Sequence, residues 1–422
     1  MNEIQCDVAV VGGGPAGLAA AVAAKRAGAA EVLVIERDKA LGGILQQCIH
    51  PGFGLKLYQQ ELTGPEYAQR FIAEAKELGV KTFLNTMVLA VDASKTITCV
   101  SADRGVTKVK AKALVLAMGC RERTRGNLAI PGTRPAGIFN AGTAQRLINI
   151  QGYMVGRKVV ILGSGDIGMI MARRLTMEGA KVEAVVEIMP YLTGLLRNRV
   201  QCLDDFNIPL LLSHTIVGIH GNARVESVTI AEVDAEMQPR PDTEREIQCD
   251  TLLLSVGLIP ENELSQKAGI ELNSITAGPA VSQRMETSLP GIFACGNVVH
   301  VNDLVDNVTV ESATAGKQAA AYALGKLAPV RRVVPTVAGN GIRYICPQRI
   351  QLSDEPEAVT LYFRVRNPAS KVRIKVSADG EELLSRGQIK VSPGEMESIT
   401  LQPELLKKIN GELQIDLVEE GR

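Results

Sequence analysis

The stretch DVAVVGGGPAG at residues 7–17 decides the fold, and the stretch KVVILGSGDIG at residues 158–168 repeats its form. In both, an apolar strand runs into the pattern G-x-G-x-x-G, which opens an apolar helix. The first glycine allows the tight turn, the second lets backbone N–H groups approach a pyrophosphate, and the third lets helix and strand pack closely. A single copy could be only a tight βα turn, but two copies in the same context predict two dinucleotide sites. The residues expected to bind are Gly12, Gly14, Pro15, Ala16 and Gly17 in the first copy and Gly163, Gly165, Asp166, Ile167 and Gly168 in the second.

Each copy ends on an acid at the same distance. Glu36 follows Gly12 by 24 residues, and Glu187 follows Gly163 by 24 residues, in both cases at the end of the next apolar strand. An acid at this position accepts hydrogen bonds from adenosine ribose hydroxyls and repels a 2′-phosphate. Residues 188–190 contain no arginine, so we expect the second site to prefer NAD(H) over NADP(H).

Composition excludes several other classes of function. The 422 residues carry 46 Lys+Arg and 46 Asp+Glu, with 3% aromatic residues and no tryptophan, which disfavours nucleic acid as a partner. The eight cysteines are scattered, with no C-x-x-C pair and no zinc spacing, so we expect a reducing, cytoplasmic setting and no metal site. Glycine and proline interrupt the apolar run at residues 8–24, which favours strand, turn and helix over a membrane span.

The remaining pattern suggests further strands and helices around the two motifs. A basic linker lies between Pro329 and Pro335, and beyond it apolar and polar residues alternate with period two. This alternation predicts a small β-sandwich-like domain over residues 330–422, to which we assign no chemistry. The other expected elements are helices at residues 64–78 and 311–324 and strands at residues 81–91, 97–101, 106–109, 113–118, 251–256 and 289–295.

Four further stretches carry a family resemblance. They are Gly42-Gly43, Ala117-Met118-Gly119, SVGLIPEN at residues 255–262 and TSLPGIFACGN at residues 287–297. With the glycine motifs, they make residues 5–328 resemble the two-dinucleotide-binding FAD oxidoreductases, the family of glutathione reductase, ferredoxin reductases and NADH oxidases. The second FAD fingerprint of that family ends in Gly-Asp, whereas this chain has Gly296-Asn297. The Asn297 amide can still bond a ribityl hydroxyl, but it brings no charge to the flavin.

The resemblance implies an α/β fold of two Rossmann-like, glutathione-reductase-type dinucleotide-binding domains, one inserted into the other, plus a small C-terminal all-β domain. The implied boundaries are residues 1–125 and 250–328 for FAD binding, 126–249 for NAD(H) binding and 330–422 for the β domain. Hydride would then move between the nicotinamide and the flavin, in a direction that the resemblance leaves open. Further FAD contacts are expected from Glu36, Arg37, Gly42, Gly43, Ala117, Gly119, Gly296 and Asn297, and further NAD contacts from Glu187 and Gly257.

Two segments resemble narrower groups. Residues 121–145 resemble the α subunits of multi-subunit amine and amino-acid dehydrogenases, such as dye-linked proline dehydrogenase, heterotetrameric sarcosine oxidase and opine oxidase. The segment CIHPGFG at residues 48–54 looks like flavoproteins encoded beside a glycerol-3-phosphate dehydrogenase-like partner in anaerobic bacteria. Both likenesses imply a partner dehydrogenase or electron-carrier subunit, and we expect an oligomer.

The cysteines depart from the family pattern. Glutathione-reductase-like enzymes carry C-x₄-C after the glycine pair, and thioredoxin reductases carry C-x-x-C in the NAD domain. Here only Cys48 follows Gly43, so we expect no dithiol relay at these positions. Cys48 is either a single redox cysteine, with His50 stabilising its thiolate, or a packed bystander. Pro51 and the glycines after it favour the second interpretation, because they prevent a helix that would lower the thiol pKa.

His300, Asp303 and Asp306 follow the second fingerprint, and the resemblance implies that they pass near the flavin. They would serve proton transfer or an interface, or else be polar surface and helix-capping residues. Three functions remain open. The favoured one is the NAD-linked electron-transfer subunit of a multi-component dehydrogenase. The alternatives are a self-sufficient NADH oxidase, peroxidase or disulfide reductase that uses Cys48, and a non-catalytic flavin-bound assembly subunit.

Overall fold

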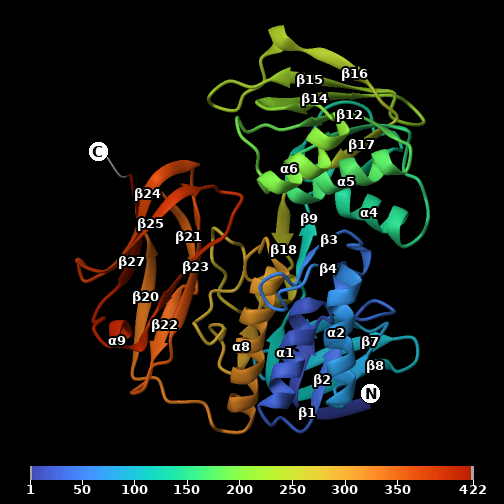
Figure 1. The fold of residues 1–422 in the computed structure, drawn as a ribbon. Coiled ribbons are helices and arrows are strands. Elements are labelled where there is room, and N and C mark those ends of the chain that lie inside the picture. Colours follow the sequence, from blue (N-terminus) through green and yellow to red (C-terminus); the bar gives the residue numbers. More distant parts are fainter. Residues whose placement is uncertain (1, 420–422) are drawn as a thin grey trace. The chain divides into compact units, whose positions relative to one another are not determined.

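Both glycine motifs lie at the carboxyl end of a parallel strand and at the start of a helix in the computed structural model, which describes residues 2–419 (Figure 1). Strand β1 (Asn2–Val11) leads into α1 (Pro15–Arg26), and β11 (Lys158–Leu162) leads into α5 (Asp166–Met177). Among the described residues, 2–120 and 260–419 form one unit and 121–259 form a second. The predicted α/β fold with two Rossmann-like halves is therefore confirmed.

The first unit is built on a seven-stranded sheet in the order β5-β2-β1-β8-β7-β6, with β19 beside β8. Its elements besides β1 and α1 are β2 (Val32–Ile35), η1 (Gly43–Gln47), β3 (Pro51–Phe53), β4 (Leu62–Thr63), α2 (Gly64–Glu77), β5 (Lys81–Phe83), β6 (Met87–Val91), β7 (Thr96–Ser101), β8 (Gly105–Leu116), α7 (Glu263–Lys267), β19 (Ile292–Ala294), η4 (Gly296–Val298) and α8 (Val305–Ala323). β9 (Cys120–Glu122) and β18 (Leu258–Pro260) carry the chain between the units.

Strand β8 has two kinds of neighbour along its length. One edge pairs with the parallel β1 along nearly the whole strand. On the other edge, the first half pairs with the antiparallel β7 and alternates exposed and buried residues, whereas the last residues pair with the parallel β19 and are buried. A strand buried on both faces carries a continuous apolar run, while a half-exposed strand alternates. The two strands predicted at residues 106–109 and 113–118 are therefore one strand.

Helix α8 begins at Val305, six residues before the predicted start at residue 311. β-Branched residues such as Val308 and Thr309 occupy its first turns, and their low helix propensity hides the helix in the sequence. The helix packs along α1 at close range, because a Cβ at Gly316 would lie 2.0 Å from the carbonyl oxygen of Ala20.

The second unit combines a five-stranded parallel sheet, β10-β17-β11-β12-β13, with a three-stranded antiparallel sheet, β14-β15-β16. β17 lies between β10 and β11, so residues 250–259 belong to this unit and not, as predicted, to the first. Its elements besides β11 and α5 are α3 (Arg125–Leu128), β10 (Ile138–Asn140), α4 (Ala141–Asn149), β12 (Lys181–Val186), α6 (Leu196–Cys202), η2 (Asp204–Phe206), β13 (Leu210–Leu211), β14 (His214–His220), β15 (Ser227–Glu232), η3 (Pro241–Thr243), β16 (Arg245–Gln248) and β17 (Thr251–Leu254).

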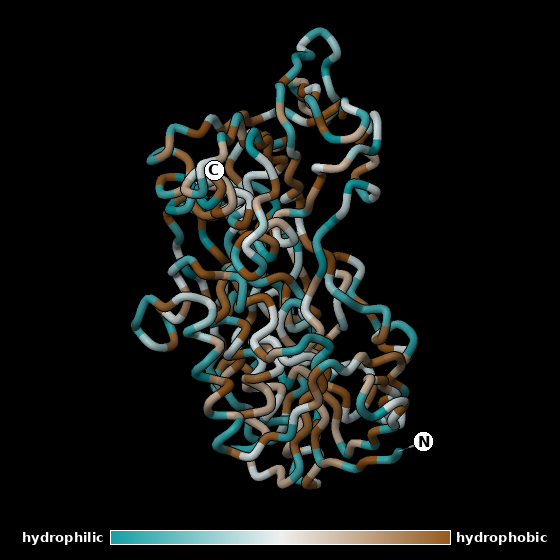
Figure 2. Tube along the Cα trace, turned by 90° about the vertical axis from the view of Figure 1, so that its right-hand side faces the viewer, coloured by the Kyte–Doolittle hydropathy of each residue, from teal (hydrophilic) through white to brown (hydrophobic). Residues whose placement is uncertain are grey.

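The C-terminal part of the first unit is a β domain with its own core. It is built of strands, with one single-turn helix, α9. A five-stranded sheet, β22-β20-β27-β24-β25, and a three-stranded sheet, β21-β23-β26, both contribute buried side chains such as Ile374 and Phe363. In Figure 2, brown hydrophobic and teal hydrophilic residues alternate along much of the trace, and in this domain the buried members of that pattern form the core. Its elements are β20 (Arg332–Ala338), β21 (Ile342–Cys346), β22 (Arg349–Leu352), β23 (Val359–Val365), β24 (Ala369–Ala378), β25 (Glu381–Val391), β26 (Glu397–Leu401), α9 (Pro403–Leu406) and β27 (Leu413–Glu419).

Membrane-spanning helices are not found among the described residues, because none of their helices is both long and apolar enough to cross a bilayer.

Candidate functional site

The first glycine turn leaves no room for side chains. Gly12 has φ +106°, and a Cβ there would lie 2.4 Å from the carbonyl oxygen of Ala117. A Cβ at Gly17 would lie 1.8 Å from the carbonyl oxygen of Gly12. Gly14 is the N-cap of α1, and Pro15 is the first residue of that helix. The turn therefore presents bare backbone at a helix N-terminus, the environment that favours a phosphate.

A second glycine pair lies against this turn. Gly42 and Gly43 both have positive φ, at +103° and +53°, and a Cβ at Gly43 would lie 2.9 Å from the Cα of Gly14. The N–H of Gly42 donates to the carbonyl oxygen of Gly13. Two glycine segments far apart in the sequence thus approach backbone to backbone, as the predicted cofactor contacts require.

The acid of the first motif is buried beside the turn. Glu36 is 7% exposed, and its Oε2 accepts a hydrogen bond from the N–H of Gly13 over 2.6 Å. Its Oε1 accepts one from the N–H of Asp38 over 2.8 Å. The neighbouring Arg37 is exposed. The carboxylate is therefore fixed at the edge of the glycine turn, where an adenosine ribose would lie.

The second unit repeats this geometry. Gly163 has φ +102° and its Cβ would lie 2.0 Å from the carbonyl oxygen of Ser255, while a Cβ at Gly168 would lie 2.5 Å from the carbonyl oxygen of Gly163. Glu187 is 4% exposed and accepts hydrogen bonds from the N–H groups of Ser164 and Met189 over 2.8 and 2.9 Å. Gly165 is the N-cap of α5, whose first residues are Asp166, Ile167 and Gly168.

One difference concerns Asp166. Its Oδ1 accepts hydrogen bonds from the N–H of Leu195 and from the Asn198 side chain, over 2.8 and 2.7 Å. Asp166 therefore ties the loop before α6 to the start of α5, a structural role that the motif did not predict.

A glycine also follows each residue whose carbonyl oxygen lies against a glycine turn, namely Ala117 in the first unit and Ser255 in the second. Gly119 comes two residues after Ala117, and Gly257 comes two residues after Ser255, with φ of +73° and +98°. Apart from the glycine itself and its two neighbours in the chain, no described residue has an atom within 4 Å of a Cβ built at either position. In each unit, open space therefore lies beside this glycine, two residues after the carbonyl that touches the glycine turn. A cofactor can lie against the backbone there.

The second fingerprint meets the first motif. A Cβ at Gly296 would lie 2.8 Å from the Cβ of Ala16. Asn297 accepts a hydrogen bond at Oδ1 from the N–H of Asn302 over 3.0 Å, and its Nδ2 lies 3.6 Å from Sγ of Cys120. The structure thus brings Asn297 and Cys120 together, a proximity that the sequence did not predict.

Cys48 lies at the end of η1, and its Sγ is 3.3 Å from the carbonyl oxygen of Ile44. Burial raises the pKa of the Cys48 thiol to about 12, which opposes a stable thiolate at neutral pH. The His50 ring lies 5.1 Å from the Phe53 ring, and its Nδ1 is 3.1 Å from the carbonyl oxygen of Pro51. All eight cysteines are thiols in the described part of the chain.

His300 is 1% exposed, so the interpretation of this residue as polar surface is wrong. Its Nε2 lies 2.5 Å from Oε1 of Glu311, and the Cys346 thiol completes a buried cluster whose three ligand-type atoms lie within 4.8 Å of one another. Burial alone lowers the pKa of His300, but Cys346 and Glu311 raise it well above its ordinary value. The sequence missed this cluster because Cys346 belongs to the β domain.

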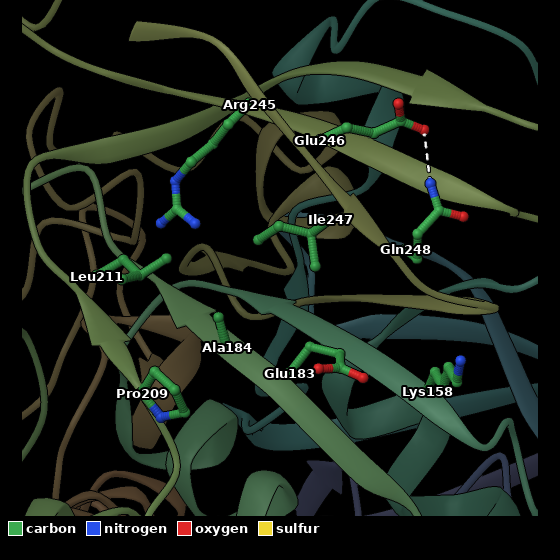
Figure 3. A pocket seen from close by; sticks show the side chains of 9 residues that line it. All are labelled: Lys158, Glu183, Ala184, Pro209, Leu211, Arg245, Glu246, Ile247 and Gln248. Atoms are coloured by element: carbon green, nitrogen blue, oxygen red, sulfur yellow. Dashed lines mark hydrogen bonds between the residues drawn. The ribbon is translucent and has the colours of Figure 1, made fainter.

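A shallow cavity of about 380 Å³ in the second unit lies apart from the glycine turn (Figure 3). Lys158, the first residue of β11, lines it, whereas Gly163 follows the last residue of that strand. In Figure 3, Glu246 and Gln248 of β16 are joined by a hydrogen bond of 3.0 Å. Charges of both signs line the cavity, and it contains none of the predicted site residues.

Comparisons with known proteins agree with this geometry. The family model described as pyridine nucleotide-disulphide oxidoreductase matches residues 6–320. Hydrogen cyanide synthase subunit HcnB of Pseudomonas protegens is 26% identical over 313 residues, or 68% of this chain and 65% of HcnB. An opine oxidase subunit of Agrobacterium tumefaciens is 26% identical over 320 residues, or 69% of this chain and 61% of that protein. The chain thus spans less than two thirds of either relative.

Among solved structures, thioredoxin reductase of T. acidophilum has a TM-score of 0.62 at 23% identity. The match covers 76% of this chain and 99% of that one, and it shows a shared fold.

Proposed function

The chain belongs to the pyridine nucleotide-disulphide oxidoreductase family and is an FAD-dependent NAD(P)H oxidoreductase, and from this premise we propose that it is the NAD(H)-linked electron-transfer subunit of a multi-component dehydrogenase. HcnB and the opine oxidase relative are, by their names, subunits of larger enzymes. The observation that carries the proposal is that the chain lacks both dithiol motifs, while the one cysteine after the glycine pair, Cys48, is a half-buried thiol with a raised pKa. Without a thiol outlet, electrons leave to an external acceptor or arrive from an external donor, and a partner subunit would serve as either.

The residues of the first unit fit FAD. A Cβ at Gly12 or Gly17 would overlap backbone, so only a glycine turn can lie so close to a diphosphate. Glu36 would hold the adenosine ribose, and Asn297 would bind the ribityl chain through its amide. In the second unit, Gly163 and Gly168 repeat the steric arrangement for NAD(H).

Bound FAD supplies a two-electron carrier that exchanges hydride with a nicotinamide and single electrons with other centres. The protein contributes binding and orientation. The glycine turns approach the diphosphates, and the helix N-termini of α1 and α5 favour their negative charge. Glu187 selects NAD(H), because a carboxylate at this position repels a 2′-phosphate.

The test is an anaerobic titration of the purified yellow protein with NADH, followed by addition of an artificial dye, oxygen, peroxide or a disulfide. We expect the flavin absorbance to bleach with NADH and to recover quickly with the dye. Rapid turnover with oxygen, peroxide or a disulfide would favour a self-sufficient enzyme and contradict the proposal. Absence of bleaching would indicate a non-catalytic subunit. Co-purification of the native chain then identifies the partner.

A further inference from the structure

The family match ends at residue 320, and the β domain follows it. We propose that this domain is part of the flavin site: it holds the segment at residues 297–306, after the second fingerprint, through two buried polar clamps, and so controls how tightly FAD is bound. The inference rests on the proposed function, because it takes Gly296 and Asn297 as FAD-binding residues.

The first clamp joins Arg364 of β23 to Asp303. The two side chains form an ion pair and are only 11% and 12% exposed. Arg364 also donates to the carbonyl oxygen of Val301 over 3.0 Å and to that of Pro393 over 2.9 Å. Asp303 in turn accepts a hydrogen bond from the N–H of Met396 over 2.6 Å. One buried guanidinium of the β domain therefore holds both a side chain and a main-chain carbonyl of the segment at residues 297–306.

The second clamp is centred on His300. Its ring pairs with Glu311 of α8 on one side, and its Nδ1 lies 3.4 Å from the hydroxyl of Tyr344 in β21 on the other. The rings of His300 and Tyr344 meet edge to face, with centroids 5.9 Å apart. Cys346 of the same strand completes the buried cluster with His300 and Glu311. Two β-domain side chains, those of Tyr344 and Cys346, therefore lie against the ring that Glu311 pairs with.

Asn302 links the second clamp to Asn297, and it lies between Val301 and Asp303, the two residues that Arg364 holds. Its Nδ2 lies 3.3 Å from the carbonyl oxygen of His300 and 3.4 Å from Oε2 of Glu311, and its N–H donates to Oδ1 of Asn297. Asn297 follows Gly296, which lies directly against Ala16 of the first motif. Movement of the clamped loop must therefore reach the residue expected to bind the ribityl chain.

The β domain has other attachments, so loss of a clamp does not release it. Gln348 and Val281 exchange two hydrogen bonds, over 2.8 and 3.1 Å. Gln351 and Gln283 exchange two more, over 2.8 and 2.7 Å. Arg349 donates to the carbonyl oxygen of Thr287 over 2.7 Å. Clamp variants can thus be studied with the domain still docked.

The test compares Arg364→Ala, the milder Arg364→Lys and Asp303→Asn with Arg366→Ala in the full chain. Arg366 is exposed and donates to the carbonyl oxygen of Ile342 within the β domain, which makes it a matched control. The readouts are the FAD dissociation constant, the visible circular dichroism of the bound flavin, and the rise in unfolding temperature on adding FAD to the apoprotein.

We expect the clamp variants to bind FAD about three- to tenfold more weakly, the effect of loosening one hydrogen bond. Their flavin dichroism should change and their gain in unfolding temperature should shrink, while Arg366→Ala matches the wild type. Asp303→Asn combined with Arg364→Ala should add little to either single change, because both remove the same contact. Equal loss of stability with and without FAD, at unchanged FAD affinity, would overturn the inference. A wild-type chain that binds no FAD would instead contradict the proposed function.

Discussion

The hydroxyl of Ser164 donates a hydrogen bond to Oε2 of Glu187 over 2.7 Å, and the N–H of Ser164 donates to the same oxygen over 2.8 Å. Thr193 adds a third donor to this oxygen over 3.0 Å. In the first motif, the corresponding oxygen of Glu36 accepts one bond, from the N–H of Gly13. Oε2 of Glu187 is thus held by more donors than Oε2 of Glu36, and the position of this carboxylate is fixed by the protein itself.

The wild type should be reduced faster by NADH than by NADPH, by at least about tenfold, because a fixed carboxylate repels a 2′-phosphate. Glu187→Gln should narrow this preference by removing the charge. Anaerobic stopped-flow reduction with each nucleotide measures the effect. Glu183→Gln, on the strand β12 that precedes Glu187, is the control, since Glu183 pairs with Lys181. Equal rates of flavin reduction by NADH and NADPH in the wild type would contradict the proposed preference for NAD(H).

Gly163→Ala should abolish reduction by NADH while FAD stays bound, because the new Cβ would lie 2.0 Å from the carbonyl oxygen of Ser255. Gly179→Ala is a matched control in the same unit. Its φ of +87° imposes similar backbone strain, yet no described atom lies within 4 Å of its Cβ. NADH titration and the flavin spectrum distinguish the two. Loss of NADH reduction in both variants would show that strain alone, and not the crowded turn, explains the result.

Cys48 should resist alkylation in the folded protein. A thiol with a pKa of about 12 is ionised far less at pH 8 than an ordinary one, so labelling by iodoacetamide should be about a thousandfold slower than for a model thiol. Peptide mass spectrometry after timed labelling checks this. Cys48→Ser should keep NADH-to-dye activity, and collapse of that activity with flavin still bound would establish a redox role.

The free energy of unfolding should fall as the pH rises above about 6.5, because the stabilisation that protonated His300 contributes is then lost. Its folded-state pKa is raised well above 6.5, so the contribution is complete below the unfolded pKa and is lost as the pH rises through the folded one. Unfolding temperatures between about pH 6.5 and 7.5 should decline less steeply in His300→Gln than in the wild type. This window ends about one pH unit below the ordinary cysteine pKa, so ionisation of unfolded cysteines contributes little within it. Parallel curves would show that His300 is not charged in the folded state.

Local sequence determines much of what was predicted correctly. β11 occupies the predicted residues 158–162, because a buried parallel strand between a charged residue and a glycine turn has clear limits. The two glycine motifs are similarly local, since each steric requirement falls within a few residues. Those signals therefore predicted where both glycine turns lie, and the acids at residues 36 and 187 are buried beside them.

Long-range packing determines what the sequence could not reveal. Arg364 looks like one polar residue in an alternating strand, yet it meets Asp303, 61 residues away. His300 meets Cys346 in the same way, across the boundary of two predicted domains. β17 was assigned to the wrong unit because an apolar strand carries no mark of the sheet it joins. The β domain consequently received no chemical role from sequence alone.

The insertion of residues 121–259 also orders events during protein synthesis. This unit is one continuous stretch, so all of its strands have left the ribosome once residue 259 has emerged. The first sheet must still wait, because β19, at residues 292–294, completes the pairing of β8. Until then, β8 exposes an unpaired edge and α1 lacks the helix α8 that covers it. A growing chain is therefore most open to aggregation and to chaperones in the interval between residues 260 and 323.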